Sequence, residues 1–438
     1  MNSREVRTLT LLAYGLPGLA AALPIIPVAI LLPTWYARDL GLGFVLTGSV
    51  LALARLLDFI SDPIVGVLVD RIGWRGLHYK FWTVIGAALA APGLLLLAFP
   101  PQPASALALG TGAVLLFSGW TAFMIPYTAW GAELSRDRNT RSLITASREV
   151  AGLIGMLVAL AVPAWLVIRF GDEAPPAMVV LAGVAFVVGI PALFALLRWV
   201  PEPTRRERRV TAGWRDLIDL LRVGDCRRML ICWLLNGIAN GLPAVLFPLV
   251  VSDFLQLGET QFYFLLVVYF ASAIAVTPAW LVIARRRGKS AAWSLAIAVN
   301  MVVFAQVLWL GPQSASWFFA ICLLSGATLG ADLALPPSIQ ADIMESDRVK
   351  SGLQRTATGF ALWSMATKLA LAIAVALAFV VGGMGPSGSS VVIGSGRLLS
   401  LYVIVPVLLK GAVYVLLRRG SLSVDLESMT QRPQAAAK

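Results

Sequence analysis

Histidine, cysteine and phosphate-binding motifs are scarce or absent in this chain, and their absence limits its chemistry. His78 is the only histidine among 438 residues. The three cysteines, Cys226, Cys232 and Cys322, lack the spacing of a metal site or a disulfide framework. The sequence also contains no nucleophile–base pair and no glycine-rich phosphate loop. We therefore predict that the protein is not an enzyme, has no catalytic residues and carries no cofactor.

Charged residues are scarce as well. They make up 13% of the chain, against about 25% in soluble domains, and 58% of the residues are hydrophobic. The mean hydropathy is +0.82. Apolar segments recur from one end of the chain to the other. This pattern predicts a membrane protein with many spans and excludes a soluble enzyme with a single anchor.

The apolar segments are long enough to cross a bilayer, which takes about 20 residues for each helix. We predict twelve transmembrane helices, at residues 9–34, 43–68, 82–99, 105–131, 143–168, 177–199, 228–254, 262–284, 291–311, 315–340, 356–383 and 394–417. The first run continues past Leu32, too far for a cleaved signal peptide, so we assign it to the first spanning helix. The fold class is therefore an all-α membrane protein with two six-helix halves.

Basic residues alternate between the two sides of the predicted membrane. The net charge is +12, which in a soluble protein would favour nucleic-acid binding. Connections from odd to even spans contain only Arg38, Arg169 and Arg397. Connections from even to odd spans contain many, for example Arg71, Arg75 and Lys80 after the second span and Arg285, Arg286, Arg287 and Lys289 after the eighth. The positive-inside rule places these connections and both termini in the cytoplasm, and we expect the inner membrane, no nucleic-acid partner and a monomer.

The longest connection divides the chain. We predict an N-terminal half at residues 1–199, a cytoplasmic linker at 200–227, a C-terminal half at 228–418 and a cytoplasmic tail at 419–438. Within the linker, Trp214, Leu217, Ile218 and Leu221 recur at helical spacing and predict a short amphipathic helix on the membrane surface. Twelve helices in two halves is the plan of major facilitator transporters, in which the solute binds at the midplane.

An acidic stripe lies inside the second predicted span. Arg55, Asp58 and Asp62 fall within roughly 60° of one another on one helical face. Ionised acids at i and i+4 repel each other, so a bound cation, a proton or a basic partner must offset the charge. A bound Na⁺ or H⁺ would make the stripe a coupling-ion site. In the structural alternative, Arg55 neutralises Asp58, and Asp62 pairs with another basic group such as Lys368.

Four stretches together resemble the glycoside–pentoside–hexuronide:cation symporters, a family within the major facilitator superfamily. They are Tyr14–Gly15; Asp58–Gly66; Pro126–Leu134 followed by Arg141 and Arg148; and Asp342–Ile343 followed by Gly352, Arg355 and Lys368. The resemblance implies that Asp58 and Asp62 bind the coupling cation, with help from Ser61 and Thr121. If the protein is sodium-coupled, the two acids are the Na⁺ ligands. Lys368 matches a family lysine that can pair with the acids when the cation is absent.

The solute side departs from the galactoside-binding pattern of the family, since Ala22 and Met124 stand where two carboxylates are expected. The remaining candidates for solute binding are Arg148, Trp120, Tyr127, Asn236, Asn240, Asp332, Lys368 and Trp363. Arg148 suits a carboxylate such as that of a uronide, unless Glu149 or Asp332 neutralises it.

Several of these candidates have an alternative structural role. Trp120 and Tyr127 also fit helix packing, and Asn236 and Asn240 also fit interhelical hydrogen bonding. Lys410 in the last span fits snorkelling to the cytoplasmic interface. As gate residues we predict charges that anchor the cytoplasmic helix ends: Asp70, Arg71, Glu133 and Arg141.

The function that fits these observations is secondary active transport of a small organic solute, a sugar, glycoside or uronide, by cation-coupled symport. One alternative is an exporter or facilitator of an apolar or lipid-like solute. An alternative of another class is a membrane sensor that does not transport.

Overall fold

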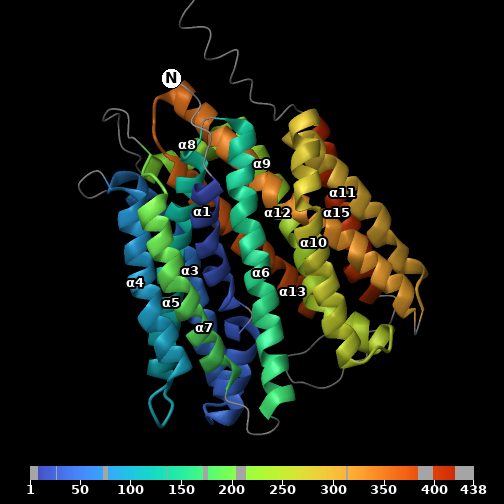
Figure 1. Cartoon of the computed structure of the whole chain (residues 1–438). Coiled ribbons are helices and arrows are strands. Elements are labelled where there is room, and N and C mark those ends of the chain that lie inside the picture. The colour runs from blue at the N-terminus through green and yellow to red at the C-terminus, as the bar shows by residue number, and fades with distance from the viewer. Residues whose placement is uncertain are drawn as a thin grey trace, which may run out of the picture. The chain divides into compact units, whose positions relative to one another are not determined.

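A computed structural model describes residues 8–25, 27–72, 77–135, 137–170, 176–203, 214–311, 314–382 and 398–419 (Figure 1). The described secondary structure consists of helices joined by short turns and connections. The predicted tail at 419–438 lies outside the described residues from position 420 onward.

Ten helical segments are long and apolar enough to cross a membrane in the part of the chain that is described. These segments belong to the helices α4 (Tyr79–Ala98), α5 (Ala106–Glu133), α6 (Arg138–Phe170), α7 (Ala177–Trp199), α9 (Gly224–Leu249), α10 (Glu259–Arg287), α11 (Lys289–Ala305), α12 (Ala315–Ser351), α13 (Thr356–Gly382) and α15 (Val405–Arg418). The π-helical turn η4 (Val250–Phe254) extends α9, and the π-helical turn η6 (Ser400–Ile404) precedes α15. The 3₁₀ turn η5 (Gln306–Trp309) follows α11.

Two further apolar helical segments complete the predicted twelve. The first is broken into α1 (Thr8–Ala22), η1 (Pro27–Leu31), α2 (Leu32–Thr34) and η2 (Trp35–Asp39). Pro24 and Pro27 lie at the break after α1, and Pro33 lies in the short helix α2, where proline cannot donate the backbone hydrogen bond of a helix interior. Pro17 is accommodated inside α1. The second is α3 (Phe44–Arg71), whose internal charges lower its hydropathy. The predicted all-helical architecture is thus confirmed.

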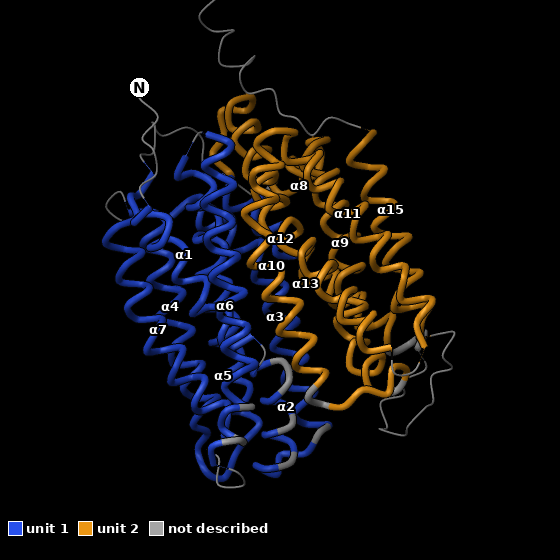
Figure 2. The backbone as a smooth tube through the Cα atoms, turned by 45° about the vertical axis from the view of Figure 1, so that its right-hand side comes forward, with its two compact units in different colours: residues 1–214, 356–365 blue, residues 215–355, 366–438 orange. Residues whose placement is uncertain are grey.

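The described chain packs as two compact units (Figure 2). Unit 1 contains residues 1–214 and 356–365, and unit 2 contains residues 215–355 and 366–438. The helix α13 therefore begins in unit 1 and continues in unit 2. The amphipathic helix predicted in the linker is present as α8 (Trp214–Arg222), where Leu220 is buried and Ile218 and Leu221 are exposed.

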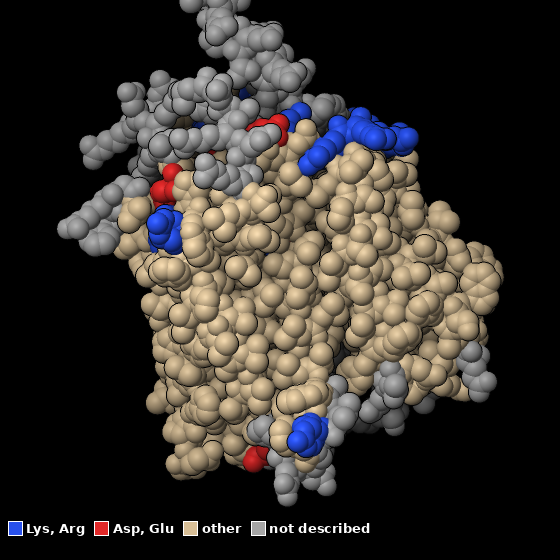
Figure 3. All heavy atoms as spheres, in the orientation of Figure 1, with Lys and Arg blue, Asp and Glu red and all other residues tan. Residues whose placement is uncertain are grey.

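Each unit has its own apolar core. In unit 1, side chains of the first span and of α3, α4, α5, α6 and α7 surround Leu97 and Leu109, which are fully buried. In unit 2, side chains of α9, α10, α11, α12, α13 and η6 surround Leu242 and Leu246. On the face shown in Figure 3, the middle of the surface lacks charged side chains, and the Lys, Arg, Asp and Glu side chains visible on it lie toward its two ends. This distribution is that of a protein whose spans face hydrocarbon.

Glycine allows a close helix contact between α4 and α5 in unit 1. Gly86 and Gly93 of α4 and Gly119 of α5 lie so near the facing backbone that an added Cβ would overlap it. Small residues at a helix interface let membrane helices approach closely and gain dispersion energy. The resulting rigid α4–α5 pair fixes the position of α5, which carries Thr121.

Candidate functional site

The acidic stripe of α3 meets a hydroxyl group of α5. Thr121 Oγ1 lies 2.8 Å from Asp58 Oδ1 and 2.9 Å from Asp62 Oδ1. All three side chains are buried, with exposed fractions of 2% for Thr121, 3% for Asp58 and 0% for Asp62. The i and i+4 spacing on α3 places both carboxylates on the face that packs against α5. The structure thus brings three of the four predicted cation-binding residues together.

The geometry of this cluster suits an additional positive charge. A threonine hydroxyl has one hydrogen, so Thr121 can donate to only one of the two carboxylate oxygens at a time. A proton on the carboxyl group, or a cation shared between the oxygens, would stabilise the other contact between the two oxygens. Carboxylate and hydroxyl oxygens are ligands suited to a hard cation such as Na⁺, so the chemistry of the donor set fits both coupling ions.

Ser61 and Arg55 take other positions. The hydroxyl group of Ser61 donates to the backbone carbonyl of Asp58 at 2.8 Å, so its hydrogen is used within α3. The guanidinium group of Arg55 lies 4.0 Å from the centre of the Phe117 ring, a cation–π contact with α5. Arg55 also lies within electrostatic reach of Asp58.

Arg148 is neutralised inside unit 1. It forms an ion pair with its neighbour Glu149, and its Nη1 donates to the Thr128 hydroxyl at 2.8 Å. Of the two acids that could neutralise Arg148, the structure therefore selects Glu149. An anionic solute would have to compete with that carboxylate for the guanidinium group.

Tyr127 connects α5 to α1 and is itself fully buried. Its hydroxyl group donates to the Tyr14 carbonyl, and the Tyr14 hydroxyl group donates back to the Tyr127 carbonyl at 3.0 Å. The two ring centres are 4.7 Å apart. This reciprocal contact accounts for the Tyr14 and Tyr127 motif residues as packing between the two helices.

Trp120 points away from the acid cluster. It lines an apolar cavity of about 170 Å³ within unit 1, formed by α1, α4, α5 and α7. The other lining residues include Pro17, Ala90, Phe123 and Leu193. Since adjacent residues of a helix differ by about 100° in direction, Thr121 faces α3 while Trp120 faces this cavity.

In unit 2, the predicted residues Asn236, Asn240 and Asp332 form one hydrogen-bonded network. Asp332 Oδ1 accepts from Trp293 Nε1 at 2.7 Å, and Asp332 Oδ2 accepts from Asn240 Nδ2 at 3.2 Å. Lys410 Nζ lies 3.0 Å from Asp332 Oδ2 and 3.1 Å from Asn236 Oδ1. The network joins α9, α11, α12 and α15.

The snorkelling prediction for Lys410 is wrong. Lys410 is 4% exposed and lies inside the Ser400–Arg418 span, where it forms a buried ion pair. Sequence reasoning missed this pair and Trp293, although a signal was available. Ionisable residues in membrane spans usually pair with one another, and Asp332 and Lys410 are opposite charges in the same predicted half.

Of the predicted gate residues, Asp70 has the clearest role. It accepts from the backbone N–H groups of Ala357 and Thr358 at 3.0 and 2.7 Å and from the Thr358 hydroxyl group at 2.6 Å. A carboxylate at a helix N-terminus satisfies the unpaired N–H groups and the helix dipole. Gly66, one turn earlier on α3, lies against Ala361, where an added Cβ would overlap that side chain. Asp70 and Gly66 thus hold the first turns of α13 against α3.

The remaining predicted residues lie on α3, α5, α6 and α13. Arg71 is exposed at the end of α3, and Arg141 is 1% exposed on α6. Glu133, at the end of α5, acts electrostatically on Asp70. Lys368 is half-buried on the part of α13 that belongs to unit 2, and Trp363 is buried on the part that belongs to unit 1.

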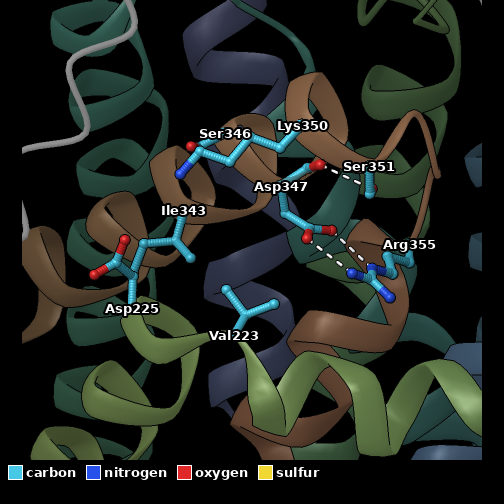
Figure 4. Close-up of a pocket in the computed structure, with 8 residues that line it drawn as sticks. All are labelled: Val223, Asp225, Ile343, Ser346, Asp347, Lys350, Ser351 and Arg355. Carbon is cyan, nitrogen blue, oxygen red and sulfur yellow. Dashed lines mark hydrogen bonds and ion pairs between the residues drawn. The ribbon is translucent and has the colours of Figure 1, made fainter.

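A polar cavity of about 310 Å³ lies in unit 2 at the end of α12 (Figure 4). In its wall the Arg355 guanidinium group faces the Asp347 carboxylate, with Nε and Nη2 at 2.7 and 2.8 Å from its two oxygens. Arg355 Nη1 also donates to Asp216 of α8 at 3.2 Å. The carboxylate of Asp347 raises the pKa of Arg355 through these hydrogen bonds. Sequence analysis assigned Arg355 to a motif and did not identify its role, which is to tie α8 to the end of α12.

Solved structures share this fold over nearly the whole chain. A bacterial homologue of the iron transporter ferroportin, in an outward-facing state, has a TM-score of 0.72 and covers 95% of this chain and 99% of its own, at 14% identity. The fucose:proton symporter of Escherichia coli has a TM-score of 0.71 and covers 94% of this chain and 97% of its own, at 12% identity. At this level of identity the likeness concerns the fold.

Sequence relatives extend the comparison. A putative glycoside/cation symporter of Escherichia coli is 23% identical over 93% of this chain and 90% of its own length. The human sodium-dependent lysophosphatidylcholine symporter 1 is 23% identical over 69% of this chain and 61% of its own length. The model of the MFS/sugar transport protein family matches residues 13–423. The chain therefore belongs to the MFS/sugar transport protein family and is a multi-pass membrane transporter rather than an enzyme.

Proposed function

We propose that this protein is a secondary active transporter that couples uptake of a small organic solute to the inward movement of Na⁺ or H⁺. The observation that carries the proposal is the buried cluster in which one Thr121 hydroxyl group contacts both Asp58 and Asp62. A proton or cation bound at the cluster would stabilise both contacts, and we propose that the coupling ion takes this place. The named glycoside/cation symporter among the relatives supports the same mechanism.

Because of the acid pair, the cation binds one conformation of the transporter more tightly than the other. Without the cation, two carboxylates repel each other in a medium of low dielectric, and a conformation that buries them is disfavoured. With the cation bound, the repulsion is removed and the buried conformation is populated. A ligand shifts a conformational equilibrium only by its difference in affinity for the two states, and this pair provides such a difference.

The gate that follows from this mechanism is the contact between α3 and α13. Asp58 and Asp62 lie on the same helix as Gly66 and Asp70, which hold the first turns of α13. A change of charge at the acid pair therefore acts on α3, the helix whose end carries Asp70. Release and recapture of the α13 N-terminus by Asp70 is the local step that we assign to alternating access.

The solute class that we propose is a sugar or glycoside, with a uronide as the charged member of the same class. The family model and the glycoside/cation symporter support this class. The ion pair between Arg148 and Glu149 favours a neutral solute, because the guanidinium charge is already compensated. We further propose that the protein works as a monomer in the inner membrane, with both termini in the cytoplasm and without nucleic-acid partners.

The test is solute-induced cation movement in proteoliposomes. Sugars, glycosides and uronides are offered one at a time, with the Na⁺ gradient and the pH gradient imposed separately. We expect one solute class to accumulate with one of the two gradients and Asp62→Asn to abolish the accumulation. Gradient-driven accumulation that persists in folded, membrane-inserted Asp62→Asn would contradict the coupling role of the pair.

A second candidate is transport of a lipid-like solute. It is favoured by the apolar cavity of α1, α4, α5 and α7 with Trp120 in its wall, and by the lysophosphatidylcholine symporter among the relatives. The same proteoliposome assay distinguishes it, since a lysophospholipid would then move with the cation while every sugar and glycoside fails.

A further inference from the structure

A buried lysine lies where an oxygen-liganded cation would fit in unit 2. Lys410 Nζ is placed 3.0 Å from Asp332 Oδ2 and 3.1 Å from Asn236 Oδ1, both within hydrogen-bond distance. Carboxylate and amide oxygens are also the ligands of a hard monovalent cation. We propose that the Lys410 ammonium group is a built-in counter-ion for Asp332, which closes a latent cation site in unit 2 and confines cation coupling to the acid pair of unit 1.

The other contacts of Asp332 support this assignment. Its carboxylate accepts from Trp293 and Asn240 as well as from Lys410, so both oxygens have N–H donors. Asp332 is 5% exposed and Lys410 is 4% exposed. A buried carboxylate that is ion-paired and hydrogen-bonded in this way has its charge compensated without any ion from solution. The same contacts leave Asp332 fewer acceptor positions for a solute than the sequence suggested.

The orientation of Asn236 is the independent observation. Its Oδ1 faces the ammonium group, while its Nδ2 is buried and has no hydrogen-bond partner within the part of the chain that the structure describes. An unsatisfied buried N–H group costs about 1–3 kcal/mol. The amide therefore presents its oxygen to the lysine although its nitrogen remains unsatisfied, as a ligand of a cation would.

The consequence concerns the number of coupled ions. Under the proposed function, the acid pair of unit 1, whose two members contact the same Thr121 hydroxyl group, takes its cation or proton from outside. The counter-ion of Asp332 is the Lys410 ammonium group, which is part of the chain. Asp332 therefore cannot exchange this counter-ion for an ion from solution during transport. Lys410 thus determines the coupling stoichiometry, with one cation site open and the other closed. This statement about transport rests on the proposed function, whereas the counter-ion role of Lys410 can be tested by binding alone.

The experiment measures Tm of the purified full-length protein while Na⁺ replaces choline at constant ionic strength, and separately between about pH 5.5 and pH 8.5. The reference is Asp62→Asn, which we expect to show no response to Na⁺. In Asp62→Asn/Lys410→Met we expect a new response, either a rise in Tm of roughly 2 °C or more with Na⁺ or a fall in Tm as the pH rises. The pH response has this sign because a proton would replace the ammonium group. Adding Asp332→Asn to that variant should remove the new response.

A folded Asp62→Asn/Lys410→Met protein with the same flat response as Asp62→Asn would overturn the proposal. If the lysine variant does not fold, the wild type is compared with the charge-neutral Asp332→Asn/Lys410→Met. We then expect the same number of bound cations in both, and a lower number in the variant would overturn the proposal. A Na⁺ response that survives in Asp62→Asn and does not depend on Asp332 would instead count against the acid pair of the proposed function.

Discussion

The two units stabilise their buried acids with different partners. In unit 2, Asp332, Asp342 and Asp347 form ion pairs with Lys410, Lys289 and Arg355, at 3.0, 2.7 and 2.7 Å. In unit 1, Asp58 and Asp62 contact the hydroxyl group of Thr121, and Asp70 accepts from the first turn of α13. All six carboxyl side chains are buried, so burial alone does not distinguish the two sets.

The two sets of acids differ in whether the partner of the carboxylate can dissociate. An ammonium or guanidinium group is attached to the chain and stays with its carboxylate, so the three pairs of unit 2 keep their charge balance. A proton, a metal cation or a helix N-terminus can dissociate from a carboxylate when the conformation changes. We infer that the three ion pairs of unit 2 keep a fixed electrostatic structure, and we assign the change of environment during transport to the proposed cation site of unit 1.

The largest expected effect comes from breaking a fixed pair. Asp332→Asn leaves Lys410 buried without its carboxylate, and losing one partner of a buried ion pair costs about 3–5 kcal/mol. We therefore expect a markedly lower Tm for the purified variant, measured by thermal unfolding. Asp332→Asn/Lys410→Met removes both charges and should recover most of the loss. Equal Tm values for the single and the double variant would show that the pair does not hold unit 2 together.

The second effect is in function rather than in stability. Asp58→Asn removes one of the repelling acids, so the fold is retained, while the cation loses a charged ligand. We expect cation activation of uptake to weaken by about 100-fold, or about 2.7 kcal/mol, with little change in Tm. Asp39→Asn, at an exposed acid of the same unit, is the matched control. A large fall in the Tm of Asp58→Asn would instead place Asp58 among the structural acids.

The sequence predicted the fold because membrane spans depend on local properties. Length, hydropathy and the alternation of basic loops identify twelve spans without any knowledge of how they pack. The acid pair could also be predicted, because acids at i and i+4 must share a helix face whatever surrounds them. Thr121 was assigned through the resemblance to a family, and its hydroxyl group indeed lies between both acids.

The other contacts of the candidate site depend on the rotation of each helix about its axis, which the sequence of a uniformly apolar span does not specify. Trp120 and Thr121 are neighbours in the sequence, yet one lines the apolar cavity and the other contacts α3. Lys410 was expected to reach the cytoplasmic interface because lysine side chains near helix ends do so. It pairs with Asp332 because α15 presents it to α9 and α12. Which face of α15 turns inward is decided by packing between helices far apart in the sequence.

A third experiment sharpens the comparison at Thr121. Thr121→Val keeps the volume and removes the hydroxyl group that both acids share. We expect the half-saturating cation concentration to rise by about tenfold, since a hydrogen bond to a charged group contributes about 1.5–3 kcal/mol. Thr121→Ser keeps the hydroxyl group and should remain close to the wild type. Equal cation dependence in the valine and serine variants would show that the hydroxyl group is not a ligand.

The smallest expected effect concerns two carboxylates, Asp70 and Glu202, that each cap the N-terminus of a helix. Asp70 accepts from the first turn of α13, and Glu202 accepts from the backbone N–H groups of His78, Tyr79 and Lys80 at the start of α4, at 2.9, 2.6 and 3.2 Å. Removing a helix cap costs about 0.5–2 kcal/mol, so Asp70→Ala and Glu202→Ala should lower Tm by similar small amounts. The α4 cap joins parts of one half of the chain, whereas the α13 cap belongs to the contact that we assign to the gate. We therefore expect the rate of solute uptake to change in Asp70→Ala and to stay near the wild-type value in Glu202→Ala. If both variants transport at the wild-type rate, Asp70 is a helix cap like Glu202, and the gate must lie elsewhere along α3 and α13.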